Sequence, residues 1–443
     1  MKLFRRLIQI TLFKFIFRKR FKLLKNKKEL YKKNLTHQEI YNFQLKKFNQ
    51  TWEYCFNNIP FYKDMKVKFN LPEKIKSLKE IEDFPVLTKE IINEKQNYIL
   101  KNLKNFYLTS TGGTSGINTY FPTSKKDADE TYANAYLGRS WWDIKPFSRI
   151  IMFWGHSHLF GKGLFSALKK FKRNFKNSLI NTIKVSSYDL DVDNLKFFYN
   201  KILKNNYDAL ISYTSNIYMI CKYMEAKNYF LNKNQIKNII LTSETVSKAD
   251  IELISKRLTK RIINEYGMAE TGVIAYSFKD TNNIRVLWDS FIINIRDDGK
   301  LYITTILPKI FPLINYYSED LATVKESFKE SVLYLASIDG KIRNILKVKC
   351  MDGSFRFIST IFFDHILKYE KNIYSIHYVQ NIDSVEIVLS SNRKLDLAAL
   401  KINVLKQAKK QFDFVDPNGI LLKQGVSRKT IAGKRCVMIT DNF

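Results

Sequence analysis

Short apolar runs alternate with amphipathic stretches along the middle of the chain. The runs RIIMFWGH, YDALISYTS, IKNIILTSE and RIINEYGMAETG contain or end in polar residues, and DADETYANAYLGRSWWDI and DLDVDNLKFFYNKILKNN between them have helical character. Apolar strands that alternate with amphipathic helices predict an α/β sheet with parallel strands. Ligands bind beyond the carboxyl ends of such strands, so the polar residues there form a candidate site: Ser243, Glu244, Tyr266 and Glu270.

The pattern of apolar and polar residues differs on either side of this middle region. KLYITTI and INYYSEDLATV predict the arms of a β-hairpin, and the residues after 338 predict a compact α+β unit. Thr88 is placed as the N-cap of a helix that follows a turn at Pro85. We therefore expect a fold of the α/β class with three parts: a basic N-terminal helix (1–35), a large domain of several sheets with parallel strands (36–338) and a small, mobile α+β domain (339–443).

The first 28 residues alternate short apolar runs with Arg and Lys and contain no acidic residue. The longest uncharged run, residues 7–13, is too short to span a bilayer, and no small-residue cleavage site follows it. Two interpretations stay open. One is a helix that lies on an anionic membrane at its inner face, and the other is a helix that packs its apolar side on the protein itself.

The composition narrows the classes of function. The net charge is +32, but lysine is spread along the whole sequence and no nucleic-acid-binding pattern appears, so we expect no specific nucleic-acid partner. The four cysteines are far apart and the five histidines form no metal motif. These features predict a cytoplasmic protein with reduced thiols and without a Ser-His-Asp or Cys-His site.

The stretch TSTGGTSG holds three of the chain's 15 glycines. It is either a plain turn-rich loop or a phosphate cradle, in which glycines let backbone N–H groups approach an anion and hydroxyls add donors. It is not a Walker A loop, because Ile117 stands where Lys is needed, and it is not a GxGxxG fingerprint.

Several motifs follow one another in a recognisable order: TGGTSG, YGMAE, FPLINYYSED, GKIRNIL and KTIAGKR. With IPFYKDM, SLKEIEDFPVLTKEII and RSWWDIKPFSRIIMFWGH, they make residues 40–440 resemble adenylate-forming (AMP-forming) ligases. The branch they resemble contains phenylacetate–CoA ligases and capsular-polysaccharide-biosynthesis proteins.

The resemblance implies a role for each matched residue. The phosphate loop would be Thr111, Gly112, Gly113, Thr114, Ser115 and Gly116, with Thr111 also taking part in catalysis. Around the nucleotide, Tyr266 and Gly267 would lie near adenine, Ser243 and Glu244 would line its pocket, and Asp320 would accept the ribose hydroxyls. Glu270 would hold Mg²⁺, Lys341 would belong to the hinge, Lys434 would be the catalytic lysine, and Trp154 and His156 would lie near the acid.

The implied reaction is ATP-dependent activation of a small carboxylic acid to an acyl-adenylate with release of pyrophosphate. A thiol or amine acceptor, such as coenzyme A, a carrier protein or an amino sugar, would then take the acyl group, with surface polysaccharide synthesis as one setting. The chain departs from the resembled patterns at Ala269, Asn315, Glu319 and residues 340–344. These departures keep open a retired ligase fold that serves as a binding or scaffold protein at a membrane surface.

Overall fold

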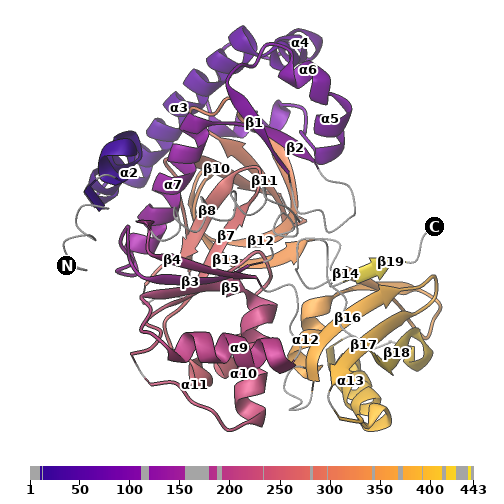
Figure 1. Cartoon of the computed structure of the whole chain (residues 1–443). Coiled ribbons are helices and arrows are strands. Elements are labelled where there is room, and N and C mark those ends of the chain that lie inside the picture. The colour runs from indigo at the N-terminus through magenta and orange to yellow at the C-terminus, as the bar shows by residue number, and fades with distance from the viewer. Residues whose placement is uncertain are drawn as a thin grey trace. The chain divides into compact units, whose positions relative to one another are not determined.

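The structure is a computed structural model of the whole chain (Figure 1). It describes residues 10–11, 13–110, 119–154, 179–186, 192–232, 234–279, 283–296, 298–341, 345–367, 373–391, 393–411, 416–425 and 438–440. The chain divides into two compact units. Unit 1 combines residues 1–147 and 264–338, and unit 2 combines residues 148–263 and 339–443. The predicted three-part division of the chain stays a prediction.

Unit 1 surrounds an antiparallel sheet with helices. Its helices are α2 (Arg18–Lys32), α3 (His37–Asn58), α4 (Pro60–Lys68), α5 (Lys89–Glu94), α6 (Gln96–Leu100) and α7 (Lys125–Ser140). Its strands are β1 (Phe106–Ser110), β2 (Tyr120–Ser124), β7 (Ile262–Met268), β8 (Gly272–Ser277), β9 (Ile284–Val286), β10 (Phe291–Ile295), β11 (Lys300–Thr305), β12 (Tyr316–Phe328) and β13 (Ser331–Lys341). The sheet order is β10-β11-β12-β13-β9-β8-β7, and β1 pairs with β2 as a separate hairpin. The predicted hairpin arms are β11 and β12, which pair antiparallel.

Side-chain caps fix where several of these helices begin. Thr36 and Glu39 form a reciprocal capping box at the start of α3, and Ser124 and Asp127 form another at the start of α7. Thr88 caps α5 as expected, because its hydroxyl accepts a hydrogen bond from the N–H of Ile91 at 3.4 Å. These caps satisfy backbone donors that a helix leaves unpaired.

Unit 2 holds a parallel sheet and a smaller sheet from the C-terminal part of the chain. The parallel part contains β3 (Ile150–Trp154), β4 (Thr182–Ser186), α9 (Val192–Leu203), β5 (Ala209–Tyr213), α10 (Thr214–Ala226), β6 (Ile239–Thr242) and α11 (Lys248–Arg257), with strand order β6-β5-β3-β4. All described pairs among these strands are parallel, as the alternating pattern predicts. Buried Ile, Leu, Phe and Tyr side chains of these strands and helices form one core.

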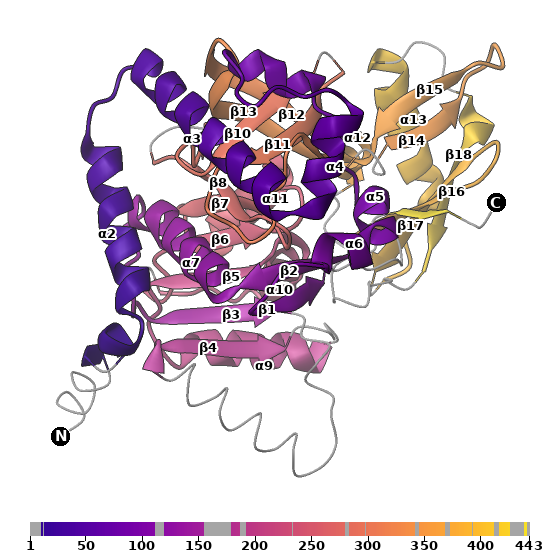
Figure 2. The same cartoon turned by 90° about the horizontal axis from the view of Figure 1, so that it is seen from above.

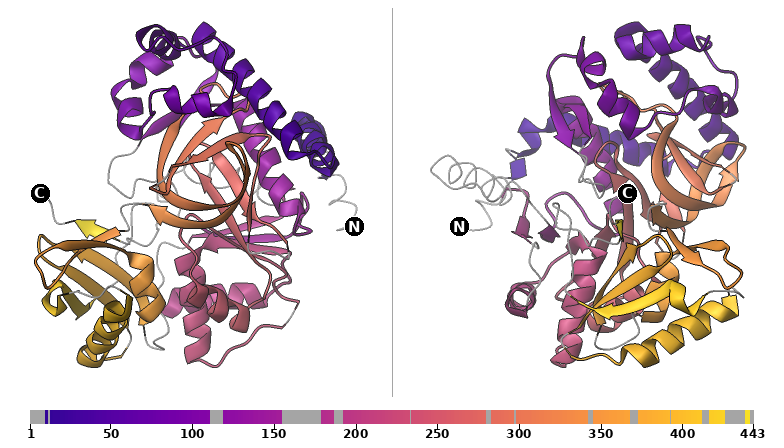
Figure 3. Two further views of the ribbon diagram at one scale, coloured as in Figure 1. Left: turned by 180° about the vertical axis from the view of Figure 1, so that it is seen from behind. Right: turned by 90° about the vertical axis from the view of Figure 1, so that its right-hand side faces the viewer.

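The C-terminal part of unit 2 has its own core. It contains β14 (Ile345–Lys349), β15 (Phe355–Ser359), α12 (Thr360–Leu367), β16 (Ile373–Gln380), β17 (Val385–Ser391), α13 (Leu397–Gln411), β18 (Ile420–Gln424) and β19 (Met438–Thr440). Its four-stranded sheet has the order β18-β17-β16-β19, and α12 and α13 pack against it (Figures 1 and 3). This part is the expected α+β unit.

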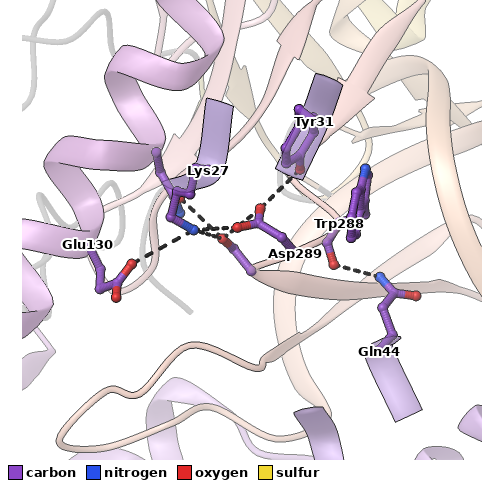
Figure 4. Close-up of polar contacts among 8 residues, drawn as sticks. Lys27, Tyr31, Gln44, Glu130, Trp288 and Asp289 are labelled. Atoms are coloured by element: carbon purple, nitrogen blue, oxygen red, sulfur yellow. Dashed lines mark hydrogen bonds and ion pairs between the residues drawn. The ribbon is translucent and has the colours of Figure 1, made fainter. Parts of the chain in front are cut away.

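The N-terminal helix α2 packs along α7 (Figure 2). Lys27 on its inner side is only 7% exposed, and its ammonium group contacts the Asp289 carboxylate, the Ser290 hydroxyl at 3.0 Å and Glu130 at 3.8 Å (Figure 4). The Tyr31 hydroxyl donates to Asp289 at 3.0 Å. The expectation that this segment packs on the protein therefore holds for the inner side of α2. Among the described residues, no helix combines the length and the apolar character needed to cross a membrane.

Candidate active site

The motif YGMAE lies at a tight turn between two antiparallel strands. Tyr266 and Gly267 belong to β7, and Glu270 stands in the turn that leads to β8. The strand register shifts between Tyr266 and Gly267, and a Cβ on Gly267 would lie 2.6 Å from the carbonyl oxygen of Gly272. Only glycine fits so close to another backbone. The sequence pattern predicts that Glu270 follows a parallel strand. In the structure Glu270 follows β7, which pairs antiparallel with the next strand, β8.

Two tyrosines and two carboxylates connect β7 and β12 reciprocally. The Tyr266 hydroxyl of β7 donates to Asp320 Oδ2 of β12 at 2.8 Å, and the Tyr316 hydroxyl of β12 donates to Glu270 Oε1 at 2.8 Å. Both carboxylates are buried, with exposed fractions of 8% for Glu270 and 7% for Asp320. Burial and the neighbouring carboxylates hold the pKa of both tyrosines well above the usual range, so the hydroxyls stay donors. These two tyrosine–carboxylate hydrogen bonds hold both carboxylates in defined positions.

Lys309 supports the same turn from behind. Its ammonium group donates to the backbone carbonyls of Glu270 at 2.8 Å and Thr271 at 3.1 Å. Burial lowers the pKa of Lys309 to about 8, although the charges of Asp127 and Glu270 oppose the shift. Lys309 therefore holds the backbone of the turn, and the hydrogen bond to the Glu270 carboxylate comes from Tyr316.

Asn315 and Glu319, which differ from the resembled motif near Asp320, both have structural roles. Glu319 has a φ of 66° and Asn315 a φ of 46°, in the left-handed region where side chains other than glycine are strained. A glycine at position 319, as in the resembled pattern, would avoid that strain. Here the Glu319 carboxylate accepts a bond from Lys89 at 2.8 Å, and the Asn315 side chain donates to the carbonyl of Phe84 at 2.6 Å. Both residues help to hold the start of β12.

Three predicted residues lie at the carboxyl ends of the parallel strands of unit 2. Trp154 ends β3 and its ring lies 4.6 Å from that of Tyr213, which ends β5. Ser243 follows β6 with a φ of 66°, and the Glu244 carboxylate accepts from the N–H and hydroxyl of Ser215 at 2.7 and 3.0 Å. The structure thus brings Trp154, Ser243 and Glu244 to one edge of this sheet, which the strand pattern predicts for Ser243 and Glu244.

The remaining predicted residues are not placed by the structure. Residues 111–116 of the phosphate loop, His156 and Lys434 lie outside the described residues. Lys341 ends β13, and its side chain is not described. The strands β1 and β2 on either side of the phosphate loop pair as far as Ser110 and Tyr120. The roles of these residues stay predictions.

Sequence reasoning missed Tyr316 and Lys309. Tyr316 stands inside the quoted motif FPLINYYSED, so the motif marked the segment without marking the residue. Lys309 precedes it in LPKIFP, where a lysine among apolar and proline residues was a usable signal of burial. Neither role is readable without knowing that β12 lies opposite the turn after β7.

Glu270 suits a hard cation. In the part of the chain that the structure describes, its carboxylate forms no ion pair, and no group of three or more His, Cys, Asp or Glu that could hold a metal is found. A buried carboxylate that forms no direct ion pair fits Mg²⁺, which is commonly held by one or two carboxylates together with substrate phosphates.

Comparisons with known proteins agree with this fold. No protein-family model matches the chain. Protein CapK of Staphylococcus aureus is 22% identical over 390 residues, which cover 85% of this chain and 83% of CapK.

Solved structures give the broader likeness. A 2-hydroxyisobutyryl-CoA ligase in the postadenylation state, in complex with 2-HIB-AMP, matches with a TM-score of 0.68 and 14% identity over 90% of this chain and 89% of that one. The same ligase with 2-HIB-AMP and CoA in the thioesterification state matches with a TM-score of 0.55 and 15% identity over 92% and 91%. The anthranilate CoA ligase AuaEII in complex with anthranoyl-AMP matches with a TM-score of 0.50 and 11% identity over 74% and 64%.

These likenesses confirm the predicted fold class and, at the level of the fold, the predicted resemblance to adenylate-forming ligases. They leave the acid and the acceptor open. The chain has the two-domain fold of the adenylate-forming CoA ligases.

Proposed function

We propose that the chain activates a carboxylic acid with ATP and transfers the acyl group to an acceptor. The observation that carries this proposal is the reciprocal pair of Tyr266–Asp320 and Tyr316–Glu270 contacts. It holds two buried carboxylates at the positions where the resemblance expects a ribose contact and a magnesium ligand, on a fold shared with ligases that were crystallised with acyl-AMP.

The chain's own residues would position anions and compensate their charge. A carboxylate oxygen of the acid forms a bond to the α-phosphorus of ATP, and the bond to pyrophosphate breaks. Asp320 accepts the ribose hydroxyls, residues 111–116 donate to the phosphates, and Lys434 offsets the negative charge of the reacting groups. Glu270 would hold Mg²⁺, whose chemistry is to neutralise phosphate charge when it is bound. No side-chain nucleophile is needed.

The acceptor we propose first is the thiol of coenzyme A. A structural neighbour was crystallised with CoA in a thioesterification state, and that neighbour matches 92% of this chain. An amine acceptor such as an amino sugar, or a carrier-protein thiol, is the second choice. The likeness to CapK over 390 residues motivates the polysaccharide setting.

The alternative of a catalytically inactive scaffold protein has less support in this geometry. It rests on departures such as Asn315 and Glu319, and both have defined partners that hold β12. Burying the Glu270 carboxylate against a neutral hydroxyl costs free energy, and a fold that has lost its reaction has no reason to keep that cost.

The test is pyrophosphate release with ATP, Mg²⁺ and a panel of aryl, acyl and amino acids. We expect acid-dependent release that falls strongly in Lys434→Ala and Glu270→Gln, and that persists in the control Lys423→Ala, an exposed lysine of β18. Calorimetry with ATP and Mg²⁺ accompanies the assay. Failure of the wild-type chain to bind ATP would overturn the proposal, and ATP binding without release from any acid would favour the scaffold alternative.

A further inference from the structure

Polar contacts attach the inner side of α2 to the rest of unit 1. They fix the orientation of the helix about its own axis. Lys27 contacts Asp289, as Figure 4 shows, and Arg20 forms an ion pair with Asp129 at 2.8 Å. Leu24 lies between them on the same side and is buried. Because these three side chains point inward, the opposite side of α2 must face outward in one defined orientation.

The outward side carries a stripe of cations. Lys14, Arg18, Lys22 and Lys25 follow each other at intervals of four, four and three residues, and all four are exposed. The N–H of Phe17 bonds to the carbonyl of Phe13 at 3.0 Å, and the non-helical backbone of Phe17 (φ −109°, ψ 29°) separates this turn, which carries Lys14, from α2, which begins at Arg18. Residues 10–28 contain no acidic residue. The turn before α2 and the outer side of α2 therefore carry four exposed cations with no acidic residue between them.

Lys28 and Glu29 limit this positive surface at its carboxyl end. Burial, followed by the charges of Lys145 and Lys32, lowers the pKa of the Lys28 ammonium group. Glu29, at the far end of the stripe, is an exposed acid that pairs with Lys25 at 3.8 Å. A surface with this sign attracts polyanions and anionic lipid headgroups.

Two large apolar side chains stand at the amino end of the stripe. Phe15 is 75% exposed and Ile16 is 63% exposed, next to Lys14 and Arg18. By contrast, Phe13 in the same turn is buried and packs against the ring of Phe147 at 5.5 Å. Exposed aromatic and aliphatic side chains beside cations are typical of a helix whose apolar residues enter the boundary between headgroups and acyl chains.

We propose that this basic outer face (Lys14, Phe15, Ile16, Arg18, Lys22 and Lys25) docks unit 1 on an anionic lipid surface. The cations bind headgroup phosphates and carboxylates, and Phe15 and Ile16 insert below them. A nucleic acid would use the cations but would offer no apolar environment for Ile16. The proposal goes beyond the reaction of the active site and does not depend on it.

The experiment is co-sedimentation of the full chain with vesicles of phosphatidylcholine, with and without 30% phosphatidylglycerol at about 0.1 M salt. We expect binding to the anionic vesicles only. The variant Lys14→Gln/Arg18→Gln/Lys22→Gln should bind on the order of a hundredfold more weakly, because each cation near an anionic surface contributes several-fold. The variant Phe15→Ser/Ile16→Ser should bind about tenfold more weakly.

A matched control removes the same charge elsewhere in unit 1. Lys63, Lys74 and Lys79 are exposed, so Lys63→Gln/Lys74→Gln/Lys79→Gln lowers the net charge equally and should keep vesicle binding within about threefold of wild type. Circular dichroism and thermal melting check that each variant is folded, which the exposure of all substituted side chains favours.

Three results would overturn the proposal. One is the absence of wild-type binding to the anionic vesicles. Another is equal weakening by the stripe variant and the control variant, which would show a diffuse effect of net charge. The third is binding to a 30-base-pair DNA duplex that requires the three cations and is unchanged in the Phe15→Ser/Ile16→Ser variant, while vesicles are not bound.

Discussion

Unit 1 contains two groups of buried carboxylates that differ in what neutralises them. Asp289 and Glu130 share the ammonium group of Lys27, and Asp289 also accepts from Tyr31 (Figure 4). Glu270 and Asp320 instead accept hydrogen bonds from the neutral hydroxyls of Tyr316 and Tyr266. A buried carboxylate that is paired with a cation is already neutralised, whereas the Glu270 carboxylate accepts a hydrogen bond from a hydroxyl and forms no ion pair among the described residues, which suits a metal ligand.

The contrast separates a structural site from a candidate active site without reference to sequence motifs. At the Lys27 site, opposite charges meet inside the protein and fasten a helix. At the Glu270 site, Lys309 bonds to the backbone carbonyls of Glu270 and Thr271 rather than to the carboxylate. Lys309 therefore fixes the turn through hydrogen bonds, and its charge acts on the Glu270 carboxylate without a direct ion pair among the described residues.

The largest expected effect is on activity at the Glu270 site. Glu270→Gln keeps the shape and the bond from Tyr316 but removes the charge, so pyrophosphate release should fall about a hundredfold or more. The melting temperature should stay within about 2 °C of wild type, since a buried charge is removed rather than orphaned. An active Glu270→Gln enzyme would remove this carboxylate from the reaction.

The reverse pattern is expected at the Lys27 site. Asp289→Asn removes the contact that neutralises a buried ammonium group, which should lower the free energy of unfolding by about 3 kcal/mol. Urea unfolding measures this loss. The activity per folded molecule should stay near wild type, and a stable but inactive Asp289→Asn protein would contradict the division between the two sites.

The buried Lys309 predicts a pH dependence with a defined sign. Its folded-state pKa is lowered from 10.5 to about 8, so above pH 8 the folded protein loses this proton while the unfolded chain keeps it. Stability from this group therefore rises with pH between 8 and 10.5. Relative to Lys309→Met, the wild type should gain about 2 kcal/mol of unfolding free energy between pH 7 and 9.5. Parallel urea-unfolding curves for the two proteins across this range would show that Lys309 does not titrate there.

The smallest effect concerns the ion pair of Lys89 and Glu319. Lys89→Met leaves a nearly buried carboxylate without its partner and should cost about 1 kcal/mol of unfolding free energy. Glu319→Gly loses the same pair but also relieves the strain of a positive φ, so its net change should lie within about 0.5 kcal/mol. Equal destabilisation by both variants would contradict the strain at position 319.

Much of the fold was predictable because it depends on local patterns. Alternating apolar runs and amphipathic stretches predicted the parallel strands β3, β5 and β6, and Thr88 marked the start of α5. Glu270, Asp320 and Tyr266 were found through a resemblance carried by short motifs, and the structure brings Tyr266 to Asp320. Whether residues 111–116 and Lys434 join them stays a prediction.

Other features depended on contacts between distant parts of the chain. Tyr316 acts on Glu270 across 46 positions, and Lys27 meets Asp289 across 262. The basic N-terminal segment shows the same limit, because its composition fits both a surface helix and a packed helix, and only the docking of α2 separates its inner side from its outer side.

The sequence by itself determined the class of fold, the alternation of strands and helices in the middle of the chain and the family that the chain resembles, because each depends on patterns a few residues long. Only the tertiary structure decided which buried charges are satisfied. The sequence does not show whether a lysine or a tyrosine contacts a carboxylate, a carbonyl or water. The free energy of a buried charge depends on which of these lies within about 3 Å.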